Sequence, residues 1–210
     1  MRQSLKDFWK GSLIWCPEKG MGHHLVSNPI KYENGYFQRY RELDKTQMGA
    51  DLTFARTRLV LKHCDHVPVD IGVGGGRFVE SMGCYGYDVN PFAVEWLKSI
   101  GRFKNPYTEE NLNAITCWDS LEHLEDPREL IDRVKGYVFV SIPIFNDSNE
   151  ILTSKHYRPG EHLWYWSRDG FVNWFDELGF DLLEQNTEET TLGRENIMSF
   201  VFKRRGFNAD

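Results

Sequence analysis

Short apolar runs alternate with helical patterns through the middle of the chain. The runs of strand length are residues 67–70, 84–88, 112–118 and 137–142. The segments between them that repeat apolar residues at helical spacing are residues 78–82, 91–100 and 128–134. A further strand near Phe103 is only faintly indicated. Alternation of this kind predicts an α/β fold, in which crossover helices cover both faces of a parallel sheet.

The C-terminal third predicts one more helix and two more strands. Ser167 stands where it would cap a helix that runs toward Leu178, and Gly179 would end that helix. Residues 180–184 and 197–202 are apolar runs joined by a polar connection. With these two runs, the pattern predicts seven strands in total.

The N-terminal part predicts helices that precede the first strand. Apolar and aromatic residues recur at helical spacing between Gly35 and Lys62, with a break expected near Gly49. Residues 1–34 are rich in Gly, Pro and His and indicate no element. Because no linker or repeat interrupts the chain, we expect a single domain over residues 1–210, with an N-terminal segment 1–62 and a core 63–205.

A glycine-rich turn follows the first strand and is the strongest chemical signal in the sequence. Asp70 comes at the end of the apolar run, and Gly72, Gly74 and Gly76 alternate with other residues behind it. Glycines at such a turn let the backbone approach a ligand closely. Asp88, at the end of the next strand, could accept both hydroxyl hydrogens of a ribose. Together these features predict a nucleotide site at the strand ends.

The spacing within the turn distinguishes two kinds of nucleotide. A dinucleotide fingerprint would have its third glycine where Arg77 stands, which disfavours a nicotinamide-dependent dehydrogenase. The order Asp70-x-Gly72-x-Gly74-x-Gly76 instead resembles motif I of class I S-adenosylmethionine-dependent methyltransferases. In that family the site holds a zwitterionic methionine tail, and the carboxylate of Asp70 would suit its cationic amino group.

Two further landmarks of this family occur in the expected order. Residues 114–127, Ala-Ile-Thr-Cys-Trp-Asp-Ser-Leu-Glu-His-Leu-Glu-Asp-Pro, resemble its strand that ends in Asp and the Leu-Glu-His-Leu segment behind it. Residues 137–143 are similar to its buried fifth strand with a terminal proline. The resemblance covers about residues 36–202. It is to small-molecule members of the family, of the kind that methylate quinone precursors.

The resemblance implies a fold and a cofactor. The fold would be Rossmann-like, with a seven-stranded, mostly parallel sheet, a terminal antiparallel strand pair and an N-terminal helical lid. The cofactor would be S-adenosyl-L-methionine. The residues expected to bind it in the core are Asp70, Gly72, Gly74, Gly76, Asp88, Val89, Asn90, Asp119 and Ser120.

The lid would add contacts from the N-terminal helices. Tyr36, Tyr40 and Arg56 could face the site and hold the carboxylate of the cofactor through their hydroxyls or guanidinium group. Packing or surface pairing is the alternative for each of these three residues. Asp119 also has an alternative role, as the cap of a helix that follows it.

Three histidines are candidates for a general base. The cofactor already carries the reactive methyl group, so the protein mainly positions the reactants, and a base is needed only for an acceptor atom that holds its proton tightly. His123 follows the fourth strand, and His156 and His162 lie in the loop after the fifth strand, which faces the substrate in similar enzymes. A capping role for His123 and a solvated position for the other two are the alternatives.

Composition narrows the partners. The net charge of −6 opposes binding to a nucleic-acid backbone, so we expect a small-molecule methyl acceptor. The four cysteines are scattered, and Cys16 with His23 and His24 lacks a fourth ligand, so we expect no metal and reduced thiols in a cytoplasmic protein. Charges interrupt the apolar runs of the N-terminus, so neither a signal peptide nor a membrane span is expected. The oligomeric state is not indicated.

Three functions therefore compete. The favoured one is an enzyme that transfers a methyl group in line to an oxygen, nitrogen or carbon of a small molecule. A nucleic-acid methyltransferase acting on base amino groups would carry an Asp/Asn-Pro-Pro-Tyr/Phe turn, where this chain has Trp118-Asp119-Ser120-Leu121. A non-catalytic module with the same fold is the remaining alternative.

Overall fold

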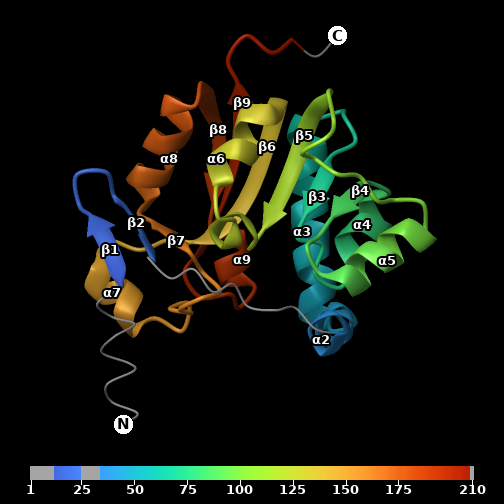
Figure 1. Ribbon diagram of the computed structural model, residues 1–210, viewed down its shortest axis with the longest axis horizontal. Coiled ribbons are helices and arrows are strands. Elements are labelled where there is room, and N and C mark those ends of the chain that lie inside the picture. Colours follow the sequence, from blue (N-terminus) through green and yellow to red (C-terminus); the bar gives the residue numbers. More distant parts are fainter. Residues whose placement is uncertain (1–11, 25–33, 209–210) are drawn as a thin grey trace.

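The computed structural model describes residues 12–24 and 34–208, so the expected lid segment 1–62 lies partly outside the described residues. A six-stranded sheet forms its centre (Figure 1). The strands of this sheet are β3 (Val69–Ile71), β4 (Tyr85–Tyr87), β5 (Leu112–Trp118), β6 (Val134–Pro143), β8 (Phe180–Asn186) and β9 (Ile197–Arg204). Their order across the sheet is β4-β3-β5-β6-β9-β8. The first four are parallel, and β9 pairs antiparallel with both β6 and β8. The α/β fold and the terminal antiparallel pair are thus confirmed.

The prediction of a seventh strand is wrong. Near Phe103 only one parallel bridge forms, to Gly86 at the edge of the sheet. Phe103 is an isolated apolar residue, flanked by Arg102 and Lys104. The amide of Arg102 already bonds to the carbonyl of Leu97 at the end of the preceding helix. The segment therefore lacks the alternating apolar side chains that would continue a strand.

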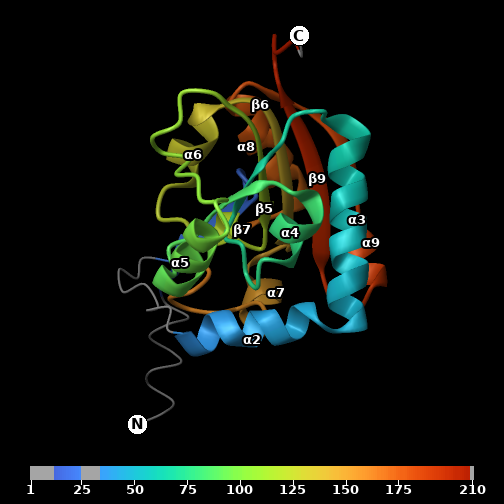
Figure 2. The same ribbon diagram turned by 90° about the vertical axis from the view of Figure 1, so that its right-hand side faces the viewer.

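Helices cover both faces of the sheet. The helices are α2 (Asn34–Asp44), α3 (Gln47–His63), α4 (Arg77–Met82), α5 (Pro91–Ser99), α6 (Pro127–Arg133), α7 (Ser148–Thr153), α8 (Arg168–Glu177) and α9 (Glu188–Thr191), with a 3-10 turn η1 (Leu121–His123). Helices α6 and α8 pack on one face, and α3, α4 and α5 pack on the other (Figures 1 and 2). Within residues 12–24 and 34–208, no helix combines the length and apolar character needed to cross a bilayer.

The central strand β6 shows how the core is divided. Val138, Val140 and Ile142 join the cluster under α6 and α8. Tyr137 and Phe139 join the cluster under α3, α4 and α5. Residues that alternate along a strand point to opposite faces, so β6 is buried from both sides. This explains why its sequence is a continuous apolar run.

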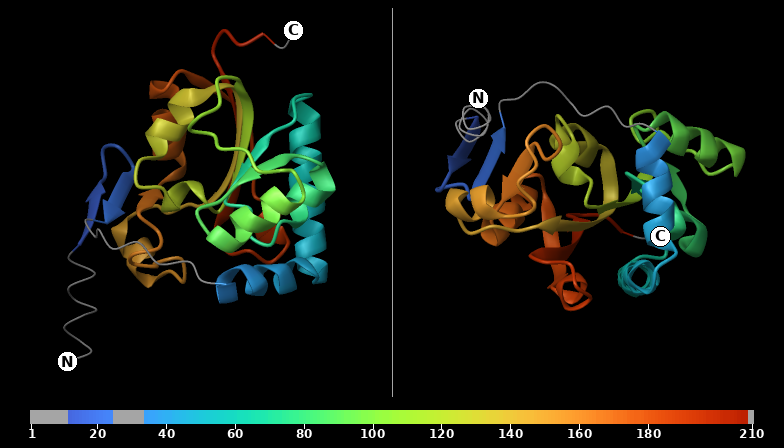
Figure 3. Two further views of the ribbon diagram at one scale, coloured as in Figure 1. Left: turned by 45° about the vertical axis from the view of Figure 1, so that its right-hand side comes forward. Right: turned by 90° about the horizontal axis from the view of Figure 1, so that it is seen from below.

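A second, smaller sheet was not predicted. Strands β1 (Leu13–Cys16), β2 (Met21–His24) and β7 (Trp164–Trp166) form an antiparallel sheet in that order. Met21 pairs with Trp166, and His23 pairs with Trp164 and stacks on its ring at 5.2 Å between centroids. The small sheet lies on the side of the molecule away from α4 and α5 (Figures 1 and 3). It joins the N-terminal hairpin to the chain that follows β6.

The two N-terminal helices break earlier than expected. The break falls at Lys45 and Thr46, and Gly49 lies inside the first turn of α3. Thr46 is the N-cap, and its hydroxyl accepts the amide of Gly49 at 3.1 Å, which fixes the start of the helix there. Helix α2 crosses below the sheet, at the carboxyl ends of the parallel strands, whereas α3 runs along the sheet (Figure 2).

Candidate cofactor and acceptor site

The glycine turn, residues 72–76, has the geometry for which its glycines are needed. Gly72, Gly74 and Gly76 have φ angles of 75°, 56° and 90°, in the region that side chains disfavour. Space is limited as well. A Cβ on Gly72 would lie 2.7 Å from Cβ of Ser120, and one on Gly76 would overlap the ring of Trp96. Backbone is therefore presented directly at the end of β3.

Asp70 lies beneath this turn. Asp70 is 1% exposed, and its carboxylate accepts a hydrogen bond from Thr116 Oγ1 at 2.7 Å. Burial raises the pKa of Asp70 to about 7. Ser120, which follows β5, lies against Gly72, and its hydroxyl donates to the carbonyl of Ile71 at 2.5 Å. The contact of Asp70 with an amino group stays a prediction, and its burial favours a role in shaping the strand end.

Asp88 links the end of β4 to the glycine turn. The amide of Val73 donates to Oδ2 at 3.0 Å, and the amide of Asn90 donates to Oδ1 at 2.8 Å. Burial raises the pKa of this carboxyl. Both oxygens are held in a fixed orientation, and each retains a lone pair for a further donor. Val89 is 63% exposed beside it, whereas the side chain of Asn90 accepts the amide of Phe92 and caps α5.

Helix α2 covers the glycine turn, in the place expected of a lid. The ring of Tyr40 lies over Gly74, where a Cβ would come within 3.4 Å of it. The hydroxyl of Tyr36 donates to that of Tyr40 at 3.3 Å. Asp44 accepts the amide of Arg77 at 3.1 Å and so caps α4, whose own N-cap, Gly76, has no side chain. Local sequence could not reveal this cap, because the two residues are far apart in the chain.

Arg56 belongs to an arginine–carboxylate network with Asp119, Glu189 and Arg194. Its guanidinium binds both oxygens of Glu189, at 2.7 and 2.8 Å, and lies 3.5 Å from Asp119. Arg194 bonds to Asp119 and lies 3.0 Å from Glu189. Burial alone would raise the pKa of Glu189, but the two arginines outweigh it and lower the pKa to about 2. Sequence analysis missed Glu189 and Arg194, which come from the polar connection before β9.

The three predicted histidines lie together, although they come from two segments. The ring centroids of His123 and His162 are 4.6 Å apart, and those of His156 and His162 are 6.4 Å apart. The alternative of a solvated loop is wrong for His156 and His162, which are 8% and 4% exposed. Burial lowers the pKa of all three, so their neutral forms prevail at neutral pH. We call His123, His156 and His162 the histidine cluster.

Hydrogen bonds to backbone carbonyls hold the two segments of the cluster in place. The amide of Leu163 donates to the carbonyl of Glu122 at 2.8 Å, and Nε1 of Trp164 donates to the carbonyl of Leu124 at 3.0 Å. Nε2 of His156 donates to the carbonyl of Glu195 at 2.8 Å. The loop after β6 is thereby fixed against η1.

Glu122 is a further polar residue in this region that sequence analysis left without a role. It is 1% exposed, and neither carboxylate oxygen has a hydrogen-bond partner within the described residues. Burial and the charge of Asp119 raise its pKa well above the usual range. Its place in the Leu-Glu-His-Leu segment was the signal that could have drawn attention to it.

Of the N-terminal cysteine and histidines, His24 lies beside the loop of the histidine cluster, because its amide donates to the carbonyl of Leu163 at 3.0 Å. In the hairpin, Cys16 pairs with Met21, whereas His23 pairs with Ile14. Cys16 and His23 therefore do not face each other across the strands. None of the four cysteines forms a disulfide.

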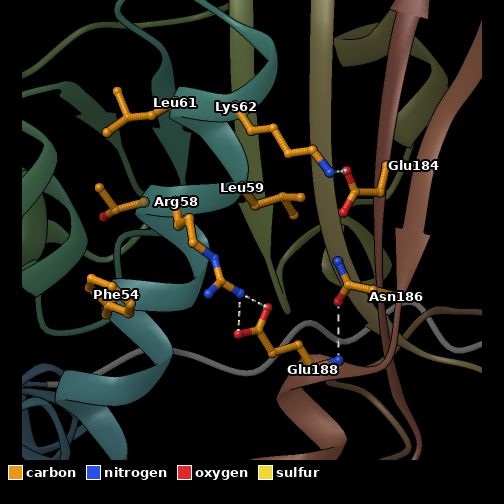
Figure 4. A pocket seen from close by; sticks show the side chains of 9 residues that line it. Phe54, Arg58, Leu59, Leu61, Lys62, Glu184, Asn186 and Glu188 are labelled. Carbon is orange, nitrogen blue, oxygen red and sulfur yellow. Dashed lines mark hydrogen bonds and ion pairs between the residues drawn. The ribbon is translucent and has the colours of Figure 1, made fainter.

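A groove of about 580 Å³ lies between α3 and β8. Two ion pairs cross it, Arg58 with Glu188 at 2.5 Å and Lys62 with Glu184 at 2.6 Å (Figure 4). None of the residues predicted for the site lines this groove. It is therefore separate from both the glycine turn and the histidine cluster.

Comparisons with known proteins agree with this architecture. A family model described as a methyltransferase domain matches residues 41–185, more than half of the chain. A comparison with curated protein sequences gives no significant match.

Solved structures of methyltransferases have the same fold. One is a methyltransferase from Thermotoga maritima described as a possible histamine N-methyltransferase, with a TM-score of 0.58 and 14% identity over 81% of this chain and 97% of that chain. Another is magnesium protoporphyrin IX methyltransferase from Synechocystis PCC 6803 with bound S-adenosylhomocysteine, with a TM-score of 0.57 and 11% identity over 81% and 95% of the two chains. From the matched family and this shared fold, we conclude that the chain belongs to the class I S-adenosylmethionine-dependent methyltransferases.

Proposed function

We propose that this methyltransferase acts on a small molecule, which meets the methyl group of the cofactor from the side of the histidine cluster. The observation that carries the proposal is the short chain segment between the two regions. Ser120 abuts Gly72 in the glycine turn, and His123 follows three residues later. Three residues span at most about 10 Å, so a cofactor over the turn would come within reach of an acceptor at the cluster.

The cofactor would lie across the ends of β3, β4 and β5. Its ribose would donate to Asp88, whose carboxylate is already oriented, and its methionine part would lie over Gly72 and Gly74. Asp119 and Ser120 would border it from the end of β5. The exposed side chain of Val89 is available to pack against the adenine.

The carboxylate of the cofactor would be held chiefly by the hydroxyls of Tyr36 and Tyr40. Arg56 is a weaker candidate, because the two arginines and two carboxylates of its network balance in charge. A contribution from Arg56 would have to compete with its two bonds to Glu189.

A histidine of the cluster would receive the acceptor proton where the acceptor atom carries one. Because Nε2 of His156 donates to a carbonyl, its Nδ1 carries the lone pair and can act as a base. His123 and His162 are neutral neighbours of the same region. The net charge of −6 supports a small acceptor over a nucleic acid.

The test is to identify the methylated product. The purified protein is incubated with a metabolite extract, a nucleic-acid fraction and S-adenosylmethionine whose methyl group is trideuterated, and products are followed by mass spectrometry. We expect label in a small molecule, and less of it with His156→Gln. Label confined to the nucleic-acid fraction would contradict the proposal.

A further inference from the structure

Three side chains that commonly bind metals converge beside η1. Glu122, His123 and His162 each offer one ligand atom, and these atoms all lie within 4.8 Å of one another. Nε2 of His123 is 3.9 Å from Oε1 of Glu122. Two imidazoles with one carboxylate are a donor set used for Zn²⁺ at catalytic sites and for Fe²⁺.

Buried atoms without partners indicate that this place is suited to a cation. Both oxygens of Glu122 and Nδ1 of His162 are buried with no hydrogen-bond partner within the described residues. The residues are 1% and 4% exposed, so water does not solvate them from outside. A carboxylate buried without a partner is strongly unfavourable, and it must either take up a proton or bind a cation. A neutral imidazole nitrogen nearby favours the cation, since it is a lone-pair donor.

The backbone preorganises the three side chains for such a role. Glu122 and His123 are consecutive in η1, and the bond from the Leu163 amide to the Glu122 carbonyl holds His162 next to them. In a tetrahedral zinc site, ligand atoms at about 2.1 Å from the ion lie roughly 3.4 Å apart. Rotamer adjustments that bring the ligand atoms closer by at most about 1.4 Å would therefore complete the site.

We propose that Glu122, His123 and His162 bind one divalent transition-metal cation, with Zn²⁺ as the best match, and leave a coordination position open toward the acceptor. Mg²⁺ fits less well, because it prefers oxygen ligands and keeps its own water. The site is distinct from Cys16, His23 and His24, which lie in the N-terminal hairpin.

The consequence for catalysis rests on the proposed function. An acceptor hydroxyl bound at the open position would lose its proton more readily, because a bound cation stabilises the oxyanion. The O–H bond breaks and the proton goes to Nδ1 of His156. The oxygen then forms a bond to the methyl carbon, and the C–S electron pair returns to sulfur, which gives neutral S-adenosylhomocysteine. No oxidant or reductant is needed.

The test measures binding of the metal alone. The full chain, without an affinity tag, is stripped with a chelator and titrated with ZnCl₂ by calorimetry, and its metal content is measured after dialysis. We expect one bound ion, and binding weaker by more than about 10-fold in Glu122→Gln and in His162→Asn. Substitution by Co²⁺ should give the visible absorption of a nitrogen- and oxygen-coordinated ion. Its loss in both variants is expected.

Matched controls separate this site from general effects on the fold. Glu184→Gln and His63→Asn remove the same chemical groups from a pair 2.6 Å apart between α3 and β8, and should leave zinc binding unchanged. Glu122→Gln also tests the alternative of a protonated carboxyl, for which glutamine is a close substitute. If it raises the melting temperature of metal-free protein while the wild type binds no stoichiometric metal, the proposal is overturned.

Binding of S-adenosylmethionine, measured on the same samples, distinguishes failure of this inference from failure of the proposed function. Normal cofactor binding without zinc binding would overturn the metal site alone. If Glu122→Gln is not folded, His162→Asn and His123→Asn provide the same comparison. Zinc binding that is unchanged in all folded variants would place the ion elsewhere and overturn the assignment.

Discussion

The glycine turn and the histidine cluster lie at the same end of the sheet, but their polar groups are in opposite states. Around the turn, Asp88 accepts two backbone amides and Ser120 donates to a backbone carbonyl. In the cluster and in the adjoining Glu122, polar atoms are buried without partners within the described residues: Nδ1 of His162 and both carboxylate oxygens of Glu122. Native proteins rarely leave such groups unsatisfied, so each one calls for an explanation. The first region is complete as an unliganded structure, whereas the second requires a ligand or a proton.

The same difference distinguishes the region that would bind a cofactor shared by the family from the region that would bind the acceptor of this particular protein. The turn presents backbone, which suits a cofactor common to a whole family. The cluster presents side chains from η1 and from the loop after β6, and β7 and the N-terminal hairpin lie against that loop. We infer that acceptor choice depends on this second region.

The largest effect is expected from breaking the arginine–carboxylate network. Glu189→Gln leaves Arg56 and Arg194 with an unbalanced charge, and removal of one partner from a buried pair costs about 3 to 5 kcal/mol of unfolding free energy. Chemical denaturation at pH 7 measures this loss. Glu188→Gln, in an exposed pair with Arg58, is the control and should cost less than about 1 kcal/mol.

The ion pairs of Glu189 also predict how the stability of the protein depends on pH. The folded-state pKa of Glu189 is about 2, below its ordinary value of 4.5, so its contribution to stability is fully present above pH 4.5 and is lost as the pH falls toward 2. The loss of stability between pH 4.5 and 2 should therefore be smaller in Glu189→Gln than in the wild type. Equal slopes in the two proteins would contradict the assigned pairing.

A somewhat smaller effect is expected from filling the glycine turn. Gly76→Ala combines a left-handed backbone with overlap of the Trp96 ring, and should cost about 2 to 4 kcal/mol of unfolding free energy. Gly83→Ala has a similar backbone conformation but nothing within 4 Å of the new methyl group. It should show only the backbone cost of about 1 to 2 kcal/mol. The difference between the two variants measures how closely the turn is packed.

Cofactor affinity should respond more moderately to Asp88. Asp88→Ala removes a charged acceptor, worth about 1.5 to 3 kcal/mol, so the Kd for S-adenosylmethionine should rise roughly 10- to 100-fold. Calorimetry on variant protein with a native circular dichroism spectrum is the measurement. An unchanged Kd would refute the ribose contact.

The smallest effect is expected in the lid. Tyr40→Phe keeps the ring over Gly74 but removes the hydroxyl that accepts from Tyr36. The Kd for the cofactor should rise by about 2- to 10-fold, as for one neutral hydrogen bond, with little change in stability. Tyr85→Phe, on the exposed side of β4, serves as the control.

The features that could be predicted from sequence depend on local patterns. The strands β5 and β6 are long apolar runs, and Ser167 and Gly179 mark the ends of α8, so these elements matched their predictions. The faint strand near Phe103 failed because one apolar residue is too little to hold a strand at an edge. The break before α3 was predicted too late in the chain. Thr46 caps the helix, and Gly49 is accommodated within its first turn.

The features that could not be predicted join residues far apart in the chain. Pairing of β2 with β7 brings residues 21–23 to residues 164–166, and neither segment shows a strong strand pattern. Asp44 caps a helix that starts at Arg77, and Arg56 finds its partner at Glu189. The three histidines of the cluster lie together in the structure, but their contact depends on hydrogen bonds that no periodicity reveals.

The peptide groups of Leu163 link the N-terminal hairpin to the segment where we propose that the acceptor binds. The Leu163 amide bonds to Glu122, and its carbonyl accepts the amide of His24 at 3.0 Å. A shift of β2 would therefore reach the neighbouring His162 through main-chain hydrogen bonds, without any side chain as intermediary. Selectivity for the methyl acceptor can in this way evolve by substitutions in the first two strands, far along the chain from the residues that would touch it.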